Sequence, residues 1–232
     1  MKAEKHDWHS IALFALGSLI GSLLGLWVMK GVPSAMAAEA PGFWFVSRAA
    51  GVVGYIMLWA STFWGILMSS KAVKELVSGP LAFTLHNVTA WLALGFSAVH
   101  AWALLGDRVV SFSPIGILLP FAANYQPVLT GLGTLSLYVG LLVSLSSYFT
   151  KHIGYRTWRL IHALSYLMFV AVTLHSVRMG TDSSTPMMQA VYFLAGGSVL
   201  FLTLFRILIV AIGSAVPKRL QAEQQRHTGS PG

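Results

Sequence analysis

Six long apolar segments restrict the fold of this chain more than any other feature of the sequence. They cover residues 10–29, 49–68, 83–105, 128–148, 158–177 and 188–212. Each has roughly the 20 residues that an α-helix needs to cross the hydrocarbon core of a bilayer. A chain in hydrocarbon must satisfy its backbone hydrogen bonds internally, and a helix does so within one segment. We therefore predict an all-α fold: a polytopic membrane protein built as a bundle of six transmembrane helices.

The composition agrees with a membrane protein and limits the possible cofactors. Only 9% of the residues are charged, against about 25% in soluble domains. The net charge is +8, but the basic residues lie between the apolar segments, which favours membrane topology over binding of nucleic acid. Cysteine is absent, so iron–sulfur clusters and covalently attached c-type heme are excluded. Any heme would be of the noncovalent b type.

Lysine and arginine predict the orientation, because they concentrate in cytoplasmic loops. With a cytoplasmic N-terminus, ten lie inside and four outside. The inside residues are Lys2, Lys5, Lys71, Lys74, Lys151, Arg156, Arg159, Lys218, Arg219 and Arg226, and the outside residues are Lys30, Arg48, Arg108 and Arg178. We expect a multi-pass protein of a cell inner (plasma) membrane with both termini in the cytoplasm.

The first apolar segment allows two interpretations. Residues 34–42 read SAMAAEAPG, which is similar to a signal-peptidase site. However, Gly17, Gly21 and Gly25 recur at four-residue spacing, a pattern typical of packed membrane helices. We favour a retained helix. The expected organisation is an N-terminal helix and outer loop (1–42), a membrane domain (43–213) and a disordered cytoplasmic tail (214–232).

Four histidines lie inside two of the apolar segments, where histidine is costly unless it has a function. His86 and His100 are 14 positions apart, and His162 and His175 are 13 apart. In the expected topology both segments run outward, so His86 pairs with His162 near the cytoplasm and His100 pairs with His175 near the outer face. Fourteen residues of helix rise about 21 Å. This arrangement predicts two stacked b hemes, with the four histidines as axial iron ligands.

The angular positions of the two histidine pairs differ. At 100° per residue, 14 positions return to within about 40° of the same face, whereas 13 miss it by roughly 140°. Either the fifth helix is distorted, or its histidines approach their hemes from different sides. The expected acceptors for the second ring nitrogens are Thr84, Asn87, Ser97, Ser165 and Ser176, and Gly95 is a place where porphyrin could approach the backbone.

Four arginines are candidates for binding the heme propionates, which are anions. Arg48 and Arg178 lie at the outer ends of their segments, and Arg159 precedes His162 by three residues. Arg206 lies within the sixth segment, where a charge is expensive. For Arg159, and for Arg156 beside it, anchoring at the cytoplasmic surface is the alternative role. For Arg206 the alternative is that its side chain extends to the inner surface.

The sequence resembles the ferric reductase-like transmembrane domain family, which includes the heme domains of ferric reductases and NADPH oxidases. The likeness is carried by the spacings His86-x13-His100 and His162-x12-His175 and by the stretches SRAAGVVGYIMLWAS (47–61), IGYRTWRLIHALSYL (153–167) and GTDS (180–183). It covers about residues 43–212. The resemblance implies a six-helix domain whose two b hemes pass electrons from the cytoplasmic side outward.

One departure from the family concerns the electron donor. Ferric reductases and NADPH oxidases carry a flavin and NADPH domain, but no G-x-G-x-x-G motif lies here between an expected strand and helix. The donor is therefore expected to be a separate cytoplasmic flavin/NAD(P)H reductase, so that flavin acts only through a partner, or else a quinol. The outer acceptor could be ferric iron, oxygen or a periplasmic protein, with loop 106–127 and residues 180–183 beside it.

The sequence is compatible with four functions. The first is transmembrane electron transfer by an iron-binding, cytochrome b-like oxidoreductase or electron-transfer subunit that has no catalytic side chain of its own. The second is the heme-binding membrane subunit of a sulfoxide reductase system. The third is a quinol-linked cytochrome b, although the Pro-Glu-Trp-Tyr motif is absent. The last is a non-redox transporter with histidine proton relays.

Overall fold

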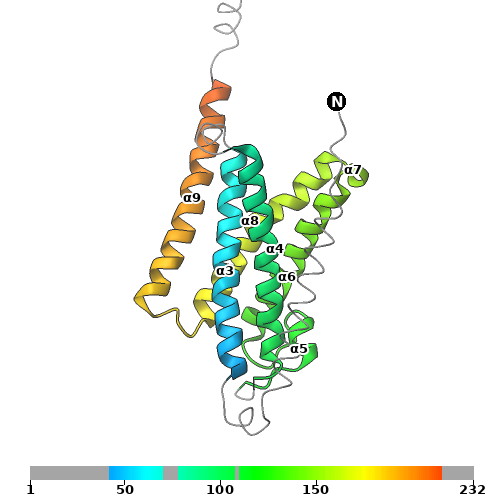
Figure 1. Ribbon diagram of the computed structural model, residues 1–232, viewed down its shortest axis with the longest axis vertical. Coiled ribbons are helices and arrows are strands. Elements are labelled where there is room, and N and C mark those ends of the chain that lie inside the picture. Colours follow the sequence, from blue (N-terminus) through cyan, green and yellow to red (C-terminus); the bar gives the residue numbers. More distant parts are fainter. Residues whose placement is uncertain (1–41, 70–77, 108–109, 216–232) are drawn as a thin grey trace, which may run out of the picture.

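A computed structural model describes residues 42–69, 78–107 and 110–215 of the chain. Five long helices dominate this part (Figure 1): α3 Gly42–Ser69, α4 Gly79–Leu104, α6 Pro127–Ser146, α8 Tyr155–Met179 and α9 Pro186–Ala215. Three short elements lie between them: α5 Pro114–Leu118, the 3-10 turn η2 Ser147–Phe149, and α7 Thr150–Ile153. The described residues contain no β-strand.

All five long helices are long and apolar enough to cross a membrane. They correspond to the second through sixth apolar segments of the sequence, so the all-α membrane fold is confirmed. The first expected helix, at residues 10–29, lies outside the described residues, as do residues 216–232 of the expected tail and most of the basic residues that predicted the orientation. The protein is thus a multi-pass membrane protein with five spanning helices in its described part.

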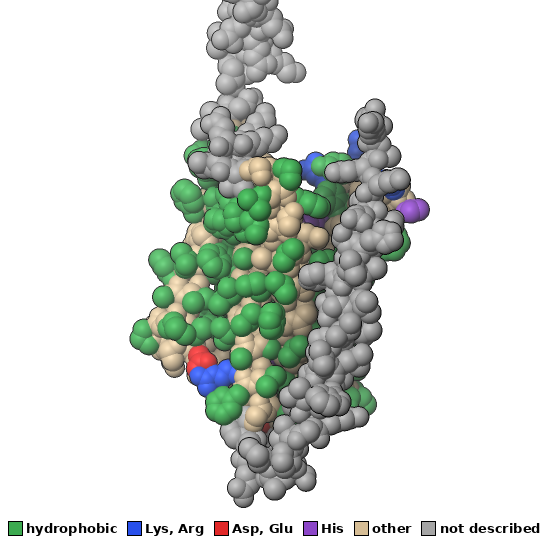
Figure 2. Space-filling view, in the orientation of Figure 1, with side chains coloured by type: hydrophobic (Ala, Val, Ile, Leu, Met, Phe, Trp, Pro, Cys, Tyr) green, Lys and Arg blue, Asp and Glu red, His purple; other side chains and the backbone are tan. Residues whose placement is uncertain are grey.

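The burial pattern is the one expected for helices surrounded by lipid. Large apolar side chains point outward, and Phe193 is 84% and Leu160 is 74% exposed. Apolar side chains cover most of the described surface in Figure 2, with charged side chains near the two ends. Many of the buried positions hold small residues, such as Ala93, Ala103 and Ala195. Small residues let membrane helices approach closely, since the lipid already solvates the large side chains.

The helices pack in two main pairs, α3 with α4 and α6 with α8. The most extensive packing is between α3 and α4, followed by that between α6 and α8. Helix α9 packs mainly on α3, where Tyr55, Phe169 and Val199 form part of a small core cluster. This arrangement places the histidine-bearing helices α4 and α8 beside two supporting helices, α3 and α6.

The connection from α6 to α8 is a tight corner. Helix α6 tightens into η2 after Ser146, α7 follows, and α8 begins after Gly154. Gly154 has a φ of 81°, a left-handed conformation that glycine adopts without steric cost. The corner ends the regular geometry of α6 close to the first turns of α8.

The connection from α4 to α6, which was expected to border the outer site, contributes residues to the cavity lining. Its short helix α5 is fastened to α6: Thr134 donates a hydrogen bond to the Ile117 carbonyl at 2.8 Å, and Tyr138 donates one to the Leu118 carbonyl at 2.5 Å. Both Ile117 and Leu118 line the central cavity. The loop thus forms part of the cavity wall next to α6.

Candidate functional site

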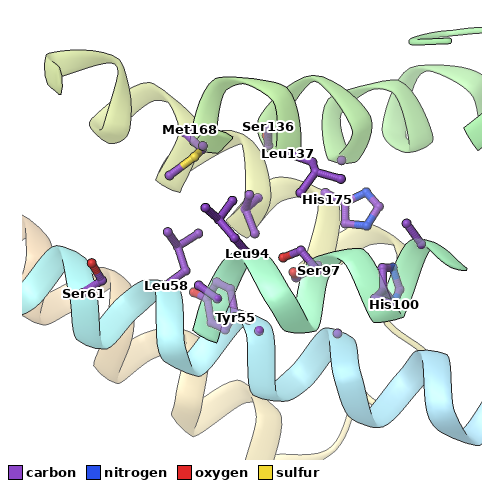
Figure 3. A pocket seen from close by; sticks show the side chains of 18 of the residues that line it. Tyr55, Leu58, Ser61, Leu94, Ser97, His100, Ser136, Leu137, Met168 and His175 are labelled. Atoms are coloured by element: carbon purple, nitrogen blue, oxygen red, sulfur yellow. The ribbon is translucent and has the colours of Figure 1, made fainter. Parts of the chain in front are cut away.

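All four intramembrane histidines line one cavity of about 1900 Å³. Helices α3, α4, α6 and α8 form most of its walls. Figure 3 shows His100 on α4 and His175 on α8 at one end of it. Sites for a single small ligand have volumes of roughly 300–1,000 Å³. The cavity therefore has room for two large ligands one after the other.

The structure brings the histidines together in the two pairs expected from the sequence. The ring centroids of His86 and His162 are 6.1 Å apart, and those of His100 and His175 are 6.2 Å apart. A metal–imidazole bond is about 2 Å long, so two rings binding one metal from opposite sides have centroids about 6 Å apart. Both pairs thus have the separation that a shared metal ion requires.

The two histidines of α4 are held by identical contacts with α3. The Nδ1 atom of His100 lies 2.8 Å from the Ser47 carbonyl oxygen, and the Ser47 hydroxyl donates to the His100 carbonyl at 3.2 Å. His86 repeats both contacts with Ser61, at 2.8 and 3.1 Å. Because a carbonyl only accepts, Nδ1 carries the proton in each ring. The lone pair of each Nε2 remains available to a metal.

A glycine one turn after each serine of α3 also lies against the histidine ring. A Cβ atom at Gly51 would lie 3.0 Å from Nδ1 of His100, and one at Gly65 would lie 3.2 Å from Cε1 of His86. Glycine therefore lets the ring reach the backbone of α3. We call each combination of an acceptor carbonyl and a glycine four residues later a clip; α3 has two, at 47–51 and 61–65.

Sequence reasoning missed the clips and chose the wrong supporting residues. The acceptors come from the neighbouring helix, whereas none of Thr84, Asn87, Ser97, Ser165 and Ser176 hydrogen-bonds a histidine ring within the described part of the chain. Gly95 is exposed there and does not line the cavity. The available signal was the pattern Ser-x3-Gly, which occurs twice in α3 with the same 14-residue spacing as His86 and His100.

Helix α8 supports its two histidines in different ways. Nδ1 of His175 lies 2.7 Å from the Leu129 carbonyl of α6, and a Cβ at Gly133 would lie 2.9 Å from Cε1 of His175, which makes a third clip. Nδ1 of His162 is buried and has no hydrogen-bond partner among the described residues. The His162 ring instead stacks on Trp158, with centroids 5.0 Å apart and planes at 30°.

This difference bears on the 13-residue spacing of His162 and His175. Helix α8 is a single uninterrupted α-helix from Tyr155 to Met179, so it does not accommodate the spacing by a break. Its two histidine rings instead rest on different supports, His175 on α6 and His162 on Trp158 of its own helix.

Three of the four candidate arginines line the cavity: Arg48, Arg159 and Arg206. Arg178 is exposed and lies outside the lining. Arg48 forms an ion pair with Asp182 in the turn after α8, and its guanidinium lies 4.7 Å from the centroid of the Trp44 ring. Arg159 lies over the ring of Tyr155 at 5.8 Å.

Apolar side chains separate the two histidine pairs. Figure 3 shows Leu58, Leu94 and Met168 in the middle of the cavity, between Ser61 and the His100–His175 pair. A Cβ atom at Gly140 would lie 3.0 Å from Leu94 and 3.1 Å from the sulfur of Met168, so these side chains meet at the glycine. Apolar walls exclude water and lower the local dielectric constant.

Comparison of the chain with protein-family models, with curated proteins and with solved structures gave no match.

Proposed function

We propose that this protein carries electrons across a membrane through two b hemes, each bound axially by one histidine pair. One observation carries the proposal: two pairs of histidines face each other across one cavity at 6.1 and 6.2 Å. In three of the four rings Nδ1 donates to a helix carbonyl, which leaves Nε2 free for iron. Electron transfer uses this protein as scaffold, and heme supplies the one-electron chemistry when bound.

The donor set favours heme over a bare metal ion. No group of three or more histidine, cysteine, aspartate or glutamate residues that could hold a metal lies within the described residues. Two imidazoles complete the coordination of an iron whose other four ligands come from a tetrapyrrole, but they leave a bare ion exposed. The large apolar cavity agrees with this choice.

Charged groups around the cavity support the proposal. Arg48 lines it near the His100–His175 pair, and Arg159 and Arg206 are available for the other heme. Both acidic residues of the described chain, Asp107 and Asp182, follow the helix ends that carry His100 and His175. The excess of positive charge near His162 supports a cytoplasmic position for that end.

The proposed path runs from an inner heme at His86 and His162 to an outer heme at His100 and His175 in a cell inner membrane. The donor is a cytoplasmic flavin/NAD(P)H reductase or a quinol, and the acceptor is ferric iron, oxygen or a periplasmic protein. The spacing and sequence stretches that resemble ferric reductase-like domains support this path. Whether the chain is itself a reductase or a subunit depends on that acceptor.

Heme content of the purified protein tests the proposal. We expect two b hemes per chain by reduced-minus-oxidised absorption, and one heme in each of the variants His100→Ala and His162→Ala. His152→Ala is the matched control, because His152 is exposed and lies outside the cavity lining. Absence of a b-type spectrum, or a heme count unchanged in both site variants, would refute the proposal.

Electron transfer through the bilayer needs a second measurement. In vesicles with a reductant and flavoprotein on the His162 side and ferricyanide on the other, we expect ferricyanide reduction only when the protein is present. Both single-histidine variants should abolish it, because each removes one of two hemes in series. Activity that persists in either variant would exclude the two-heme path.

A further inference from the structure

The two histidines of the inner pair are supported differently. His86 has a clip, whereas His162 has none among the described residues. His175 uses the carbonyl of Leu129 and the space at Gly133. Since α6 and α8 pack side by side, the matching position for His162 lies about four turns further along α6. Fourteen residues beyond Leu129 and Gly133 are Val143 and Ser147.

Neither Val143 nor Ser147 has the feature that a clip for His162 would need. The Val143 carbonyl accepts hydrogen bonds from the Ser146 hydroxyl at 2.8 Å and from the Ser147 hydroxyl at 3.4 Å. Ser147 also brings a side chain to the position that glycine holds in the other clips. Regular α6 geometry ends here, because Ser147 begins the 3-10 turn η2.

The Trp158 ring takes over the support of His162. Trp158 donates from Nε1 to the Ser147 hydroxyl at 3.2 Å and stacks on the His162 ring. Of the four histidine rings, His162 alone lacks an Nδ1 acceptor within the described chain. Loss of such an acceptor typically weakens metal binding by about 10- to 100-fold, because the hydrogen bond orients the ring and raises its basicity.

We propose that His162 is the displaceable ligand of the protein, so that the inner heme iron binds a small neutral ligand such as carbon monoxide while the outer iron does not. This inference rests on the proposed function. In the exchange, the bond from iron to Nε2 of His162 breaks and a bond from ferrous iron to carbon forms. No electron or proton is transferred, and the imidazole leaves as a neutral ring. Trp158 acts as a positioning residue through His162.

Carbon monoxide titration of the dithionite-reduced holoprotein tests this assignment. We expect one carbon monoxide per two hemes in the unaltered protein, seen as a shift of half of the Soret band. The double variant His86→Ala/His162→Ala keeps only the outer heme and should bind none. Binding to neither heme, to both hemes, or to the heme of that double variant would overturn the inference. A protein without heme would instead refute the proposed function.

Substitution of the stacked tryptophan tests the role of Trp158. We expect Trp158→Ala to lower the half-saturating carbon monoxide concentration roughly 2- to 10-fold, since aromatic stacking contributes energy of that size. Trp158→Phe should restore the original value, because it keeps the stack. Trp102→Ala is the control: Trp102 packs on Phe43 and lies outside the cavity lining. An equal effect of Trp158→Ala and Trp102→Ala would contradict the positioning role.

Discussion

The helix pairs α3–α4 and α6–α8 differ in how they support their histidine rings. Along α3 and α4, two clips recur at one spacing, so both histidines of α4 rest on the same neighbouring helix. Along α6 and α8, only His175 has a clip, and His162 rests on a tryptophan. Fourteen residues are close to four full helical turns, whereas 13 fall short of a whole number of turns. The 14-residue repeat lets α3 support both rings of α4, whereas α6 supports only one ring of α8.

The clip occurs twice between α3 and α4 but only once between α6 and α8. The α3–α4 pair carries each element twice: a serine, its carbonyl, a glycine and a histidine. Equivalent substitutions in its two clips should therefore have similar effects, each on the proposed heme of its own histidine. In α6 and α8 the two histidine supports differ, so substitutions there should affect the two proposed hemes unequally.

The largest effect is expected at the third clip. Gly133→Ala places a methyl group 2.9 Å from Cε1 of His175, close to three ring atoms, and the ring must leave the Leu129 carbonyl. We expect the affinity of the outer heme to fall about 10- to 100-fold, with the inner heme retained. Heme stoichiometry during dilution into an apoprotein acceptor measures the loss.

Gly95→Ala is the matched control for this variant, because a Cβ there meets no described atom within 4 Å. Equal heme loss in Gly133→Ala and Gly95→Ala would show that the clip is not what holds His175.

A smaller and symmetric effect is expected at the two clips of α3. The substitutions Gly51→Ala and Gly65→Ala bring a methyl group to 3.0 and 3.2 Å from the rings of His100 and His86. These contacts are longer than the 2.9 Å at Gly133, so we expect a cost near the lower end of the about 1 to 3 kcal/mol that overpacking costs. Each variant should shift the midpoint potential of one heme, the outer for Gly51→Ala and the inner for Gly65→Ala. If potentiometric titration showed the same heme shifted in both variants, the two clips would not each support a separate heme.

The serine hydroxyls should matter less than the glycines. Ser47→Ala and Ser61→Ala remove the hydroxyl bond to the histidine carbonyl at 3.2 and 3.1 Å and the contact of the same hydroxyl with Nδ1 at 3.0 and 3.1 Å. They leave the serine carbonyl that accepts from Nδ1 at 2.8 Å. Interhelical hydrogen bonds in membranes average about 0.6 kcal/mol. We expect each variant to keep both hemes and to unfold at slightly lower denaturant in detergent. Heme loss in either would mean that the hydroxyl, and not the carbonyl, fixes the ring.

The smallest effect on stability is expected at the ion pair of Arg48 and Asp182. Both side chains are partly exposed, Arg48 by 35% and Asp182 by 22%, and pairs of this kind contribute at most about 1 kcal/mol. We expect Arg48→Ala and Asp182→Ala to leave unfolding nearly unchanged. If Arg48 also holds an outer propionate, only Arg48→Ala should shift the outer midpoint potential. Equal shifts in both variants would assign Arg48 to the ion pair alone.

The described helices could be predicted from the sequence because membrane burial depends on local composition. An apolar run of the required length forms a helix whatever its neighbours are. The pairing of His86 with His162 and of His100 with His175 was also predictable, since it follows from helix direction and rise. Which groups surround each histidine was not, because the acceptors at Ser47, Ser61 and Leu129 belong to other helices.

The arginines show the same limit. Their sequence positions put Arg48 and Arg178 at similar depths, yet only Arg48 reaches the cavity. The two arginines lie on different helices, and only the packing of those helices decides which side chain faces the cavity. The ion pair with Asp182 joins residues 134 positions apart, which no local pattern indicates.

By itself, the sequence determined that this protein has apolar membrane helices and that its four intramembrane histidines form two levels, because hydrophobicity and helical rise act locally. Only the tertiary structure decided how each histidine ring is held. Carbonyls and glycines are present in every helix, and they become acceptors and ring seats only where two helices meet at one register. That register supplies three clips and leaves His162 with a tryptophan.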